Sequence, residues 1–134
     1  MSHHRKIRVG MVGGGGPANF FGGPHRTAIL MDNTAELTAG ALRSSPQGSI
    51  EAAHELHFTR GYPDYKTMIR EEAALPEDQR IEYVTVVTPN DTHYEVAKAS
   101  LEAGIPVLCE NPLTITLEES LDLVRLTKEK GLPF

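Results

Sequence analysis

Four consecutive glycines, Gly13 to Gly16, follow a short β-branched run and precede a segment with helical spacing. Within this stretch, Gly13, Gly15 and Ala18 fit the pattern G-x-G-x-x-A. The first glycine of this pattern permits a tight turn, the second lets the backbone approach a pyrophosphate, and the small third residue lets helix and strand pack closely. We therefore expect a dinucleotide-phosphate site here, with Gly16 in the same turn; the alternative is a glycine-rich turn without a ligand. A Walker-type phosphate loop is excluded because no Gly-Lys-Ser or Gly-Lys-Thr follows.

The segment after the second predicted strand carries a guanidinium and hydroxyl groups, and it lacks a carboxylate. It reads Leu42, Arg43, Ser44 and Ser45. Domains that bind NAD usually place Asp or Glu near this point, where it hydrogen-bonds the adenosine ribose. A guanidinium beside hydroxyls suits a 2′-phosphate better. We therefore expect NADP in preference to NAD; the alternative is that Arg43 is an ordinary solvated surface arginine.

Polar residues also follow two later predicted strands, where ligands of open parallel sheets bind. The candidates at this edge are Thr88, Pro89, Asn90, His93, Glu110, Asn111 and Pro112. His93 could donate a hydrogen bond to a ribose or substrate oxygen, or it could be a capping or surface residue. The sequence offers no histidine pair in a metal-binding motif, so we expect no metal site.

The remaining histidines and the single cysteine are expected to be structural. His25, His54 and His57 fall in segments of helical spacing, which indicates packing or surface positions. Cys109 has no base at a supporting spacing and is expected to be a buried small residue. One cysteine cannot form an intrachain disulfide, which fits a cytoplasmic location.

Short β-branched runs alternate with helical segments, which predicts an α/β fold, a Rossmann-like doubly wound parallel sheet in a single domain. Strands are expected at 7–12, 36–42, 83–88 and 105–109, with a further strand starting at 132–134. Helices are expected at 25–31, 46–57, 64–74 and 117–130, and another begins near a cap at Asp91 or Thr92 and ends at Gly104. Ser45 and Thr116 are the predicted N-caps of the second and last helices.

Composition sets limits on the partners. The 134 residues include 13 Lys and Arg against 18 Asp and Glu, a net charge of −5, so a nucleic-acid partner is not expected. Apolar runs are only a few residues long, far short of the roughly 20 that a membrane span needs, so no membrane association is expected. Residues 1–4 could be a tag or a disordered terminus, and 5–134 form the expected NAD(P)-binding domain.

The glycine turn, the Thr88-Pro89-Asn90 to His93 segment and the Glu110-x-Pro112 segment, in this order, resemble the N-terminal domain of the Gfo/Idh/MocA oxidoreductases. The resemblance covers residues 5–134. It implies a Rossmann domain that binds NADP or NAD, hydride transfer at a hydroxyl of a sugar, inositol or similar polyol, and a second domain that completes the active site and mediates oligomerisation. Because 134 residues match one half of such a protein and end where another strand is due, we expect a truncated form that binds cofactor but does not complete catalysis alone.

The family places a lysine where this sequence has Asn111, and the resemblance gives that lysine contacts with the nicotinamide ribose and the substrate. Asparagine can hydrogen-bond a ribose hydroxyl but cannot place a cation beside a developing alkoxide. Two interpretations stay open: a variant oxidoreductase in which Asn111 keeps a catalytic part, with His93 as a further candidate, or a non-catalytic NAD(P)-sensing or interaction module on the same fold.

Overall fold

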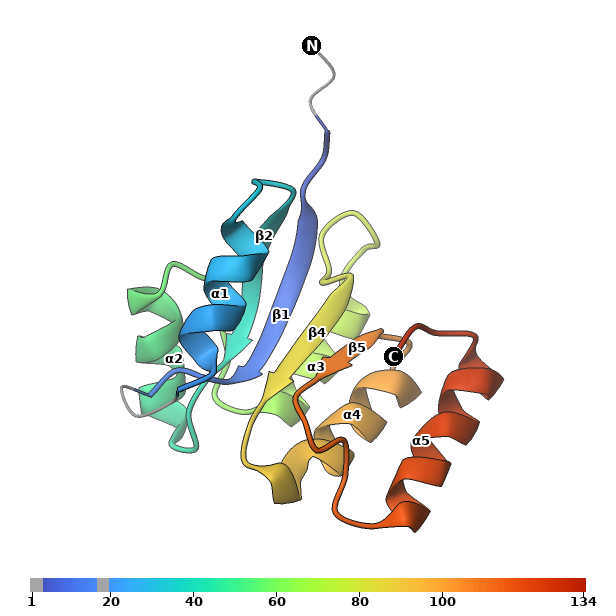
Figure 1. Cartoon of the computed structure of the whole chain (residues 1–134). Helices are drawn as coiled ribbons and strands as arrows, with labels where there is room; N and C mark the ends of the chain where they lie inside the picture. Colours follow the sequence, from blue (N-terminus) through green and yellow to red (C-terminus); the bar gives the residue numbers. More distant parts are fainter. Residues whose placement is uncertain (1–3, 17–19) are drawn as a thin grey trace.

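A five-stranded parallel sheet with the strand order β3-β2-β1-β4-β5 forms the centre of the molecule (Figure 1). The computed structural model describes residues 4–16 and 20–134. The elements are β1 (Ile7–Gly13), α1 (Gly22–Leu30), β2 (Ala35–Ala41), α2 (Pro46–Glu55), β3 (Arg60–Gly61), α3 (Tyr65–Ala74), β4 (Tyr83–Val87), the 3₁₀ helix η1 (Asn90–Thr92), α4 (His93–Glu102), β5 (Val107–Cys109) and α5 (Leu117–Lys130).

The predicted α/β architecture is confirmed, and the differences lie in short elements. The two-residue strand β3 was not predicted, because two residues carry no periodic pattern. The strand expected at 132–134 was wrong, since these residues have no strand geometry, although the Val107 amide donates to the Pro133 carbonyl at 3.3 Å. The first helix begins earlier than expected, at Gly22.

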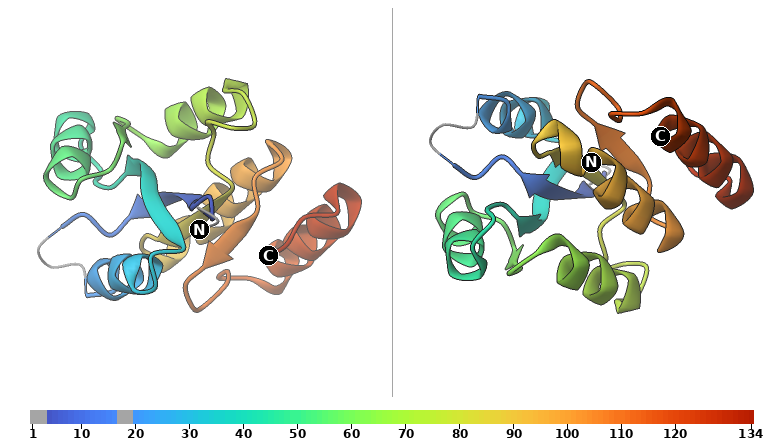
Figure 2. Two further views of the ribbon diagram at one scale, coloured as in Figure 1. Left: turned by 90° about the horizontal axis from the view of Figure 1, so that it is seen from above. Right: turned by 90° about the horizontal axis from the view of Figure 1, so that it is seen from below.

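Apolar side chains cover both faces of the sheet, because successive residues of a strand point to opposite sides. Met11 of β1 belongs to a buried cluster that includes residues of β2 and α2 and packs against Ile29 of α1. Its neighbour Val12 belongs to a larger cluster with residues of α3, α4 and α5. The two further views show helices on both sides of the sheet (Figure 2). Within the described part of the chain, no helix is both long enough and apolar enough to cross a membrane.

Polar side chains define where several helices begin. Ser45 accepts a hydrogen bond from the Gly48 amide at 3.2 Å, and Thr116 forms a capping box with Glu119, so both predicted caps are confirmed. Of the two caps predicted for α4, Thr92 occupies the N-cap position, but its side chain makes no cap bond. Its hydroxyl instead donates to the carbonyl of Pro89, the residue before η1.

A buried carboxylate joins α3 to β3 and to the start of β4. Glu72 is fully buried and accepts hydrogen bonds from Arg60 Nε at 2.7 Å, Arg60 Nη2 at 2.9 Å, the Tyr62 hydroxyl at 2.8 Å and the Ile81 amide at 3.0 Å. Burial, followed by the Glu72 contact, raises the pKa of Tyr62 to about 12. A charge in such a place is tolerated only while its partners remain.

We expect Arg60→Ala to lower the free energy of unfolding by about 2–4 kcal/mol at neutral pH, because it leaves a buried carboxylate without its cation. Urea unfolding followed by circular dichroism measures the change. Arg70→Ala is the matched control, since the Arg70–Glu71 pair is exposed and such pairs contribute about 0.5 kcal/mol or less. Equal effects of the two substitutions would contradict the role given to the Glu72 network.

Candidate cofactor-binding site

The glycine turn after β1 passes so close to its neighbours that side chains do not fit. A Cβ on Gly13, where φ is +81°, would lie 2.7 Å from the Val87 carbonyl oxygen, and one on Gly15 would lie 2.5 Å from the Cβ of Leu42. A Cβ on Gly22 would lie 2.1 Å from the Gly14 carbonyl oxygen. The turn is therefore packed between the ends of β4 and β2 and the start of α1.

Gly16 differs from these three glycines, because an added Cβ would meet no atom of residues 4–16 and 20–134 within 4 Å. The predicted site residue Ala18 lies outside the described residues. The described part of the turn thus has tightly packed backbone on its inner side, and the phosphate site expected here stays a prediction.

Two arginines hold the carbonyl groups of the glycine turn. Arg26 Nη1 donates to the Gly14 carbonyl at 2.6 Å, and Arg43 Nε donates to the Gly15 carbonyl at 2.8 Å. Arg43 and Ser44 are exposed and lie two and three residues after the end of β2. The sequence placed Arg43 and Ser44 at the end of β2, and the structure adds the contact that brings the Arg43 guanidinium beside the turn.

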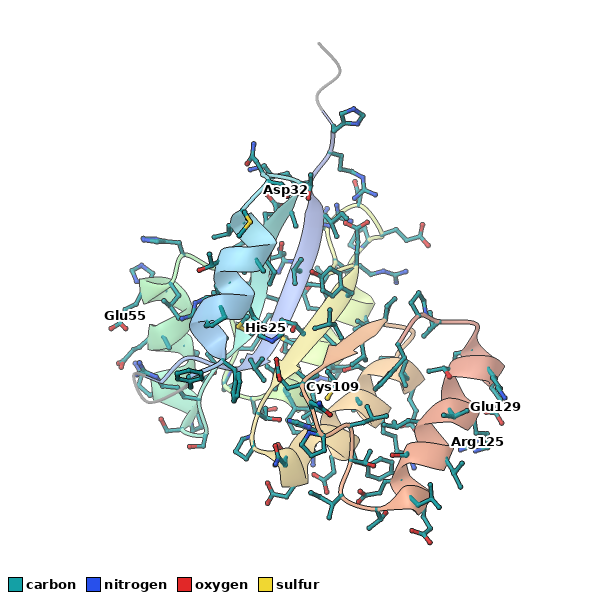
Figure 3. The ribbon with its side chains drawn as sticks, viewed as in Figure 1. His25, Asp32, Glu55, Cys109, Arg125 and Glu129 are labelled. Atoms are coloured by element: carbon teal, nitrogen blue, oxygen red, sulfur yellow. The ribbon has the colours of Figure 1, made fainter. Side chains whose placement is uncertain are left out.

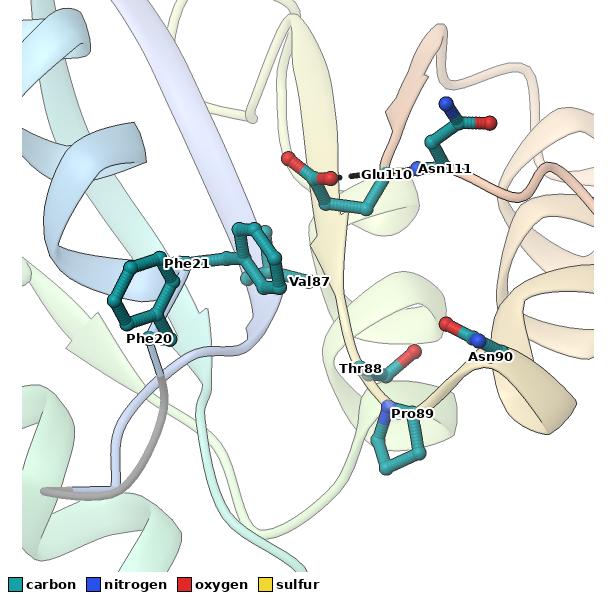
Figure 4. Close-up of a pocket in the computed structure, with 8 residues that line it drawn as sticks. All are labelled: Phe20, Phe21, Val87, Thr88, Pro89, Asn90, Glu110 and Asn111. Atoms are coloured by element: carbon teal, nitrogen blue, oxygen red, sulfur yellow. Dashed lines mark hydrogen bonds between the residues drawn. The ribbon is translucent and has the colours of Figure 1, made fainter.

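A cavity of about 300 Å³ opens at the carboxyl ends of β4 and β5, beside the start of α1 (Figure 4). Its lining residues are Phe20, Phe21, Val87, Thr88, Pro89, Asn90, Glu110 and Asn111. Five of these, Thr88, Pro89, Asn90, Glu110 and Asn111, are sequence candidates, so two segments about 20 residues apart do meet at one edge. Phe20, Phe21 and Val87 were missed; the two adjacent aromatic residues in a Gly- and Pro-rich loop were the available signal.

Thr88 carries a polar atom that needs a partner. Its Oγ1 is buried and has no hydrogen-bond partner among residues 4–16 and 20–134. Leaving such a group unsatisfied costs about 1–3 kcal/mol. A hydroxyl in this state at a cavity wall can be satisfied by a polar group of a ligand, and this fits the expected dinucleotide.

Glu110 is held from two sides. His25 Nε2 contacts Glu110 Oε1. The backbone N–H of Asn111 donates to Glu110 Oε2 at 3.3 Å (Figure 4). The His25 contact is the largest cause that keeps the pKa of Glu110 below its usual value. His25 also contacts the Thr85 hydroxyl through Nδ1 at 3.1 Å. The expectation that His25 is only a packing or surface residue was wrong, because the helical spacing hid a specific pair with Glu110.

His93 occupies a different position from the one expected of a ligand-binding residue. It is fully buried and does not line the cavity. Its Nδ1 lies 2.7 Å from the Pro112 carbonyl oxygen and its Nε2 lies 2.9 Å from the Thr88 carbonyl oxygen. The ring thus joins the two loops that line the cavity.

The remaining candidates are Asn111, Pro112 and Cys109. Asn111 is exposed at the cavity, and its peptide bond to Pro112 is cis. Cys109 is half-buried, and burial together with the charge of Glu110 raises its pKa to about 11. A neutral thiol is a poor nucleophile. No group of three or more metal-binding side chains occurs in the part of the chain that the structure describes.

Comparison with known proteins finds relatives that are described as oxidoreductases or dehydrogenases. The GFO_IDH_MocA family model, described as "Oxidoreductase family, NAD-binding Rossmann fold", matches residues 7–134. The uncharacterized oxidoreductase YfiI of Bacillus subtilis (strain 168) is 42% identical over 130 residues, covering 95% of this chain and 32% of YfiI. The scyllo-inositol 2-dehydrogenase (NADP(+)) IolW of the same strain is 32% identical, covering 94% of this chain and 31% of IolW.

Among solved structures, an inositol dehydrogenase homolog from Azotobacter vinelandii, complexed with NADH and myo-inositol, is similar with a TM-score of 0.88 and 41% identity. The match covers 96% of this chain and 34% of that protein. This chain thus spans about a third of the length of the relatives it matches. The match over nearly the whole chain, together with the glycine turn and the two strand-end segments, shows that the chain belongs to the Gfo/Idh/MocA oxidoreductase family and corresponds to its NAD-binding Rossmann domain.

Proposed function

We propose that residues 5–134 bind a nicotinamide dinucleotide across the carboxyl edge of the sheet, with the pyrophosphate at the glycine turn and the nicotinamide end in the cavity beside β4 and β5. The observation that carries this proposal is the close packing of Gly13, Gly15 and Gly22 against Val87, Leu42 and the Gly14 carbonyl, which holds the backbone of the turn against the strand ends and the start of α1. Such a tight turn between a strand and a helix is the arrangement that binds a pyrophosphate. We include Gly16 and Ala18 in the proposed turn.

The proposed nicotinamide end is built from the two strand-end segments. The buried Thr88 hydroxyl and the exposed Asn90 and Asn111 amides supply hydrogen-bonding groups there. Glu110 holds the start of the 110–112 segment in place through its contacts with His25 and with the backbone N–H of Asn111. His93 and Pro112 act from behind the cavity, because the His93 ring bridges the Thr88 and Pro112 carbonyl groups.

We favour NADP over NAD for this chain. Relatives are found with either cofactor, since IolW is named for NADP(+) and the Azotobacter vinelandii homolog was solved with NADH. We therefore base the preference on this chain's own residues after β2. Arg43 and Ser44 are exposed there, and the bond from Arg43 Nε to Gly15 holds the guanidinium at the edge of the turn. A cation in this position attracts a 2′-phosphate.

For the longer proteins in which this domain occurs, we propose hydride transfer to or from a sugar, inositol or similar polyol. A bound nicotinamide supplies the hydride acceptor or donor. Removing hydride from an alcohol also requires a group that accepts the hydroxyl proton. Among the described residues that line the cavity, Glu110 is the one with an ionisable side chain, and it is already engaged by His25. We therefore assign the proton-accepting group, the substrate contacts and the oligomer interface to a second domain.

A non-catalytic role as an NAD(P)-sensing module is the second candidate, and Asn111 favours it. The cavity lining contains no lysine or arginine in the described part of the chain. A developing alkoxide would thus find no cation supplied by this domain.

Fluorescence titration with NADPH and NADH tests the cofactor assignment. We expect saturable binding of both, with tighter binding of NADPH. Because Arg43 also holds the Gly15 carbonyl, the ratio of the two Kd values is the informative measurement. We expect Arg43→Ser to shift this ratio about tenfold toward NADH, which corresponds to the loss of one charge-assisted contact.

Arg70→Ser, at an exposed arginine of α3, is the control and should leave the ratio unchanged. Tighter binding of NADH by the unmodified chain would refute the role given to Arg43. Failure of both nucleotides to bind would refute the nucleotide site itself.

Incubation of the chain with NADP⁺ or NAD⁺ and a panel of inositols and sugars tests whether this domain binds cofactor but needs a second domain for catalysis. We expect no increase in absorbance at 340 nm beyond that of the cofactor alone, although the cofactor binds, because the proton-accepting group is assigned to another domain. A single polyol that yields reduced cofactor would show that this domain completes the reaction by itself.

A further inference from the structure

His25, Thr85 and Glu110 come from three different elements and meet in front of the sheet. His25 lies on α1, Thr85 on β4, and Glu110 follows β5 directly. His25 contacts Thr85 through one ring nitrogen and Glu110 through the other. Figure 3 shows the labelled His25 between the start of α1 and the end of β5, where Cys109 is labelled.

The carboxylate determines the direction of one of these contacts. An ionised carboxylate only accepts, so His25 Nε2 donates to Glu110. The Thr85 hydroxyl can both donate and accept, so it satisfies Nδ1 in either ring form. Thr85 is 1% exposed, so its side chain is a fixed anchor for the ring. The His25 and Glu110 side chains are 19% and 26% exposed, which places their contact at the edge of the core.

The chain of contacts continues to the proposed nicotinamide end. The carboxylate oxygen of Glu110 that does not contact His25 accepts from the Asn111 amide at 3.3 Å. Glu110 and Asn111 both line the cavity. The orientation of the Asn111 backbone is therefore connected to His25 through one carboxyl group.

We propose that His25 is a positioning residue: by holding Glu110, it sets the Glu110–Asn111 turn so that this turn fits the nicotinamide half of a bound dinucleotide. The inference rests on the proposed function and deepens it. His25 itself does not line the cavity, so it acts through Glu110.

A merely structural pair makes a different prediction. If the pair only tied α1 to β5, its loss would weaken all nucleotides alike through a less stable fold. If it positions the turn, its loss weakens ligands that carry a nicotinamide and spares ligands that end at the adenosine half. NADPH and 2′,5′-ADP provide this contrast, because both carry the 2′-phosphate and only NADPH reaches the cavity.

The test compares Kd values for NADPH and 2′,5′-ADP by titration calorimetry in the unmodified chain and in His25→Leu, with unfolding temperatures measured alongside. We expect His25→Leu to weaken NADPH about tenfold, equivalent to the loss of one charge-assisted hydrogen bond, and to change 2′,5′-ADP less than about twofold. His25→Gln should restore most of the NADPH affinity, because its amide nitrogen can donate to Glu110 from near the Nε2 position.

His54→Leu is the matched control, since His54 is an exposed histidine on α2 that is not among the lining residues of the cavity. It should leave both Kd values unchanged. If leucine at position 25 prevents folding, His25→Ala removes the same donor with a smaller side chain, and the same selectivity is expected.

Equal weakening of the two ligands, or no selective loss in any of these variants, would overturn the positioning role and leave the nucleotide site standing. If the unmodified chain binds neither ligand, the proposed function fails first and this inference fails with it. If it binds NADPH no more tightly than 2′,5′-ADP, the nicotinamide half gains nothing from the cavity, and the positioning role is refuted.

Discussion

The candidate site depends on how closely the backbone passes at the glycine turn. Gly13 packs against Val87 at the end of β4, and Gly15 packs against Leu42 after β2. Gly22, at the start of α1, packs against the Gly14 carbonyl. A side chain at any of these points would push the helix or the turn away from the strands. Glycine at these three positions therefore allows α1 and the turn to pack close to the strands. This close packing determines how far the side chains of α1 extend across the sheet.

The sheet topology explains why such distant segments share one edge. From the central strand β1 the chain builds β2 and β3 on one side and β4 and β5 on the other. The order reverses between β1 and β4, and the crevice at that point receives groups from both halves. The glycine turn and Arg43 come from the first half, and the cavity-lining residues 87–90 and 110–111 come from the second. Because the strands are parallel, all of these segments lie at the same edge of the sheet, although they are far apart in the sequence.

The sequence was sufficient for the parts of the structure that follow from local patterns. The β-branched run at 83–88, the Ser45 cap and the capping box at Thr116 each have a local physical cause, and each appears in the structure. It was not sufficient for contacts between elements. Helical spacing alone placed His25 on a packing face, because the partner that gives it a specific role, Glu110, lies 85 residues away.

His93 shows the same limit from the opposite direction. Its place beside a strand end suggested contact with a ligand, but the ring turns inward to the Thr88 and Pro112 carbonyl groups. Neither carbonyl is visible as a partner in the sequence, because every residue has one. Position at the edge of the sheet could thus be predicted from the sequence, whereas the direction of the side chain could not.

Helix α1 connects the two ends of the proposed cofactor site through two consecutive residues. Arg26 reaches back to the Gly14 carbonyl at the phosphate turn, and His25 reaches across β4 to Glu110 at the cavity. Neighbouring positions on a helix point about 100° apart, so a single turn of helix can serve both directions. A change in the position of α1 relative to the glycine turn would therefore also move the Glu110–Asn111 turn, because His25 of α1 contacts Glu110. The phosphate end and the nicotinamide end are in this sense one structural unit, and Val87, which lines the cavity and pairs with Gly13, joins them directly.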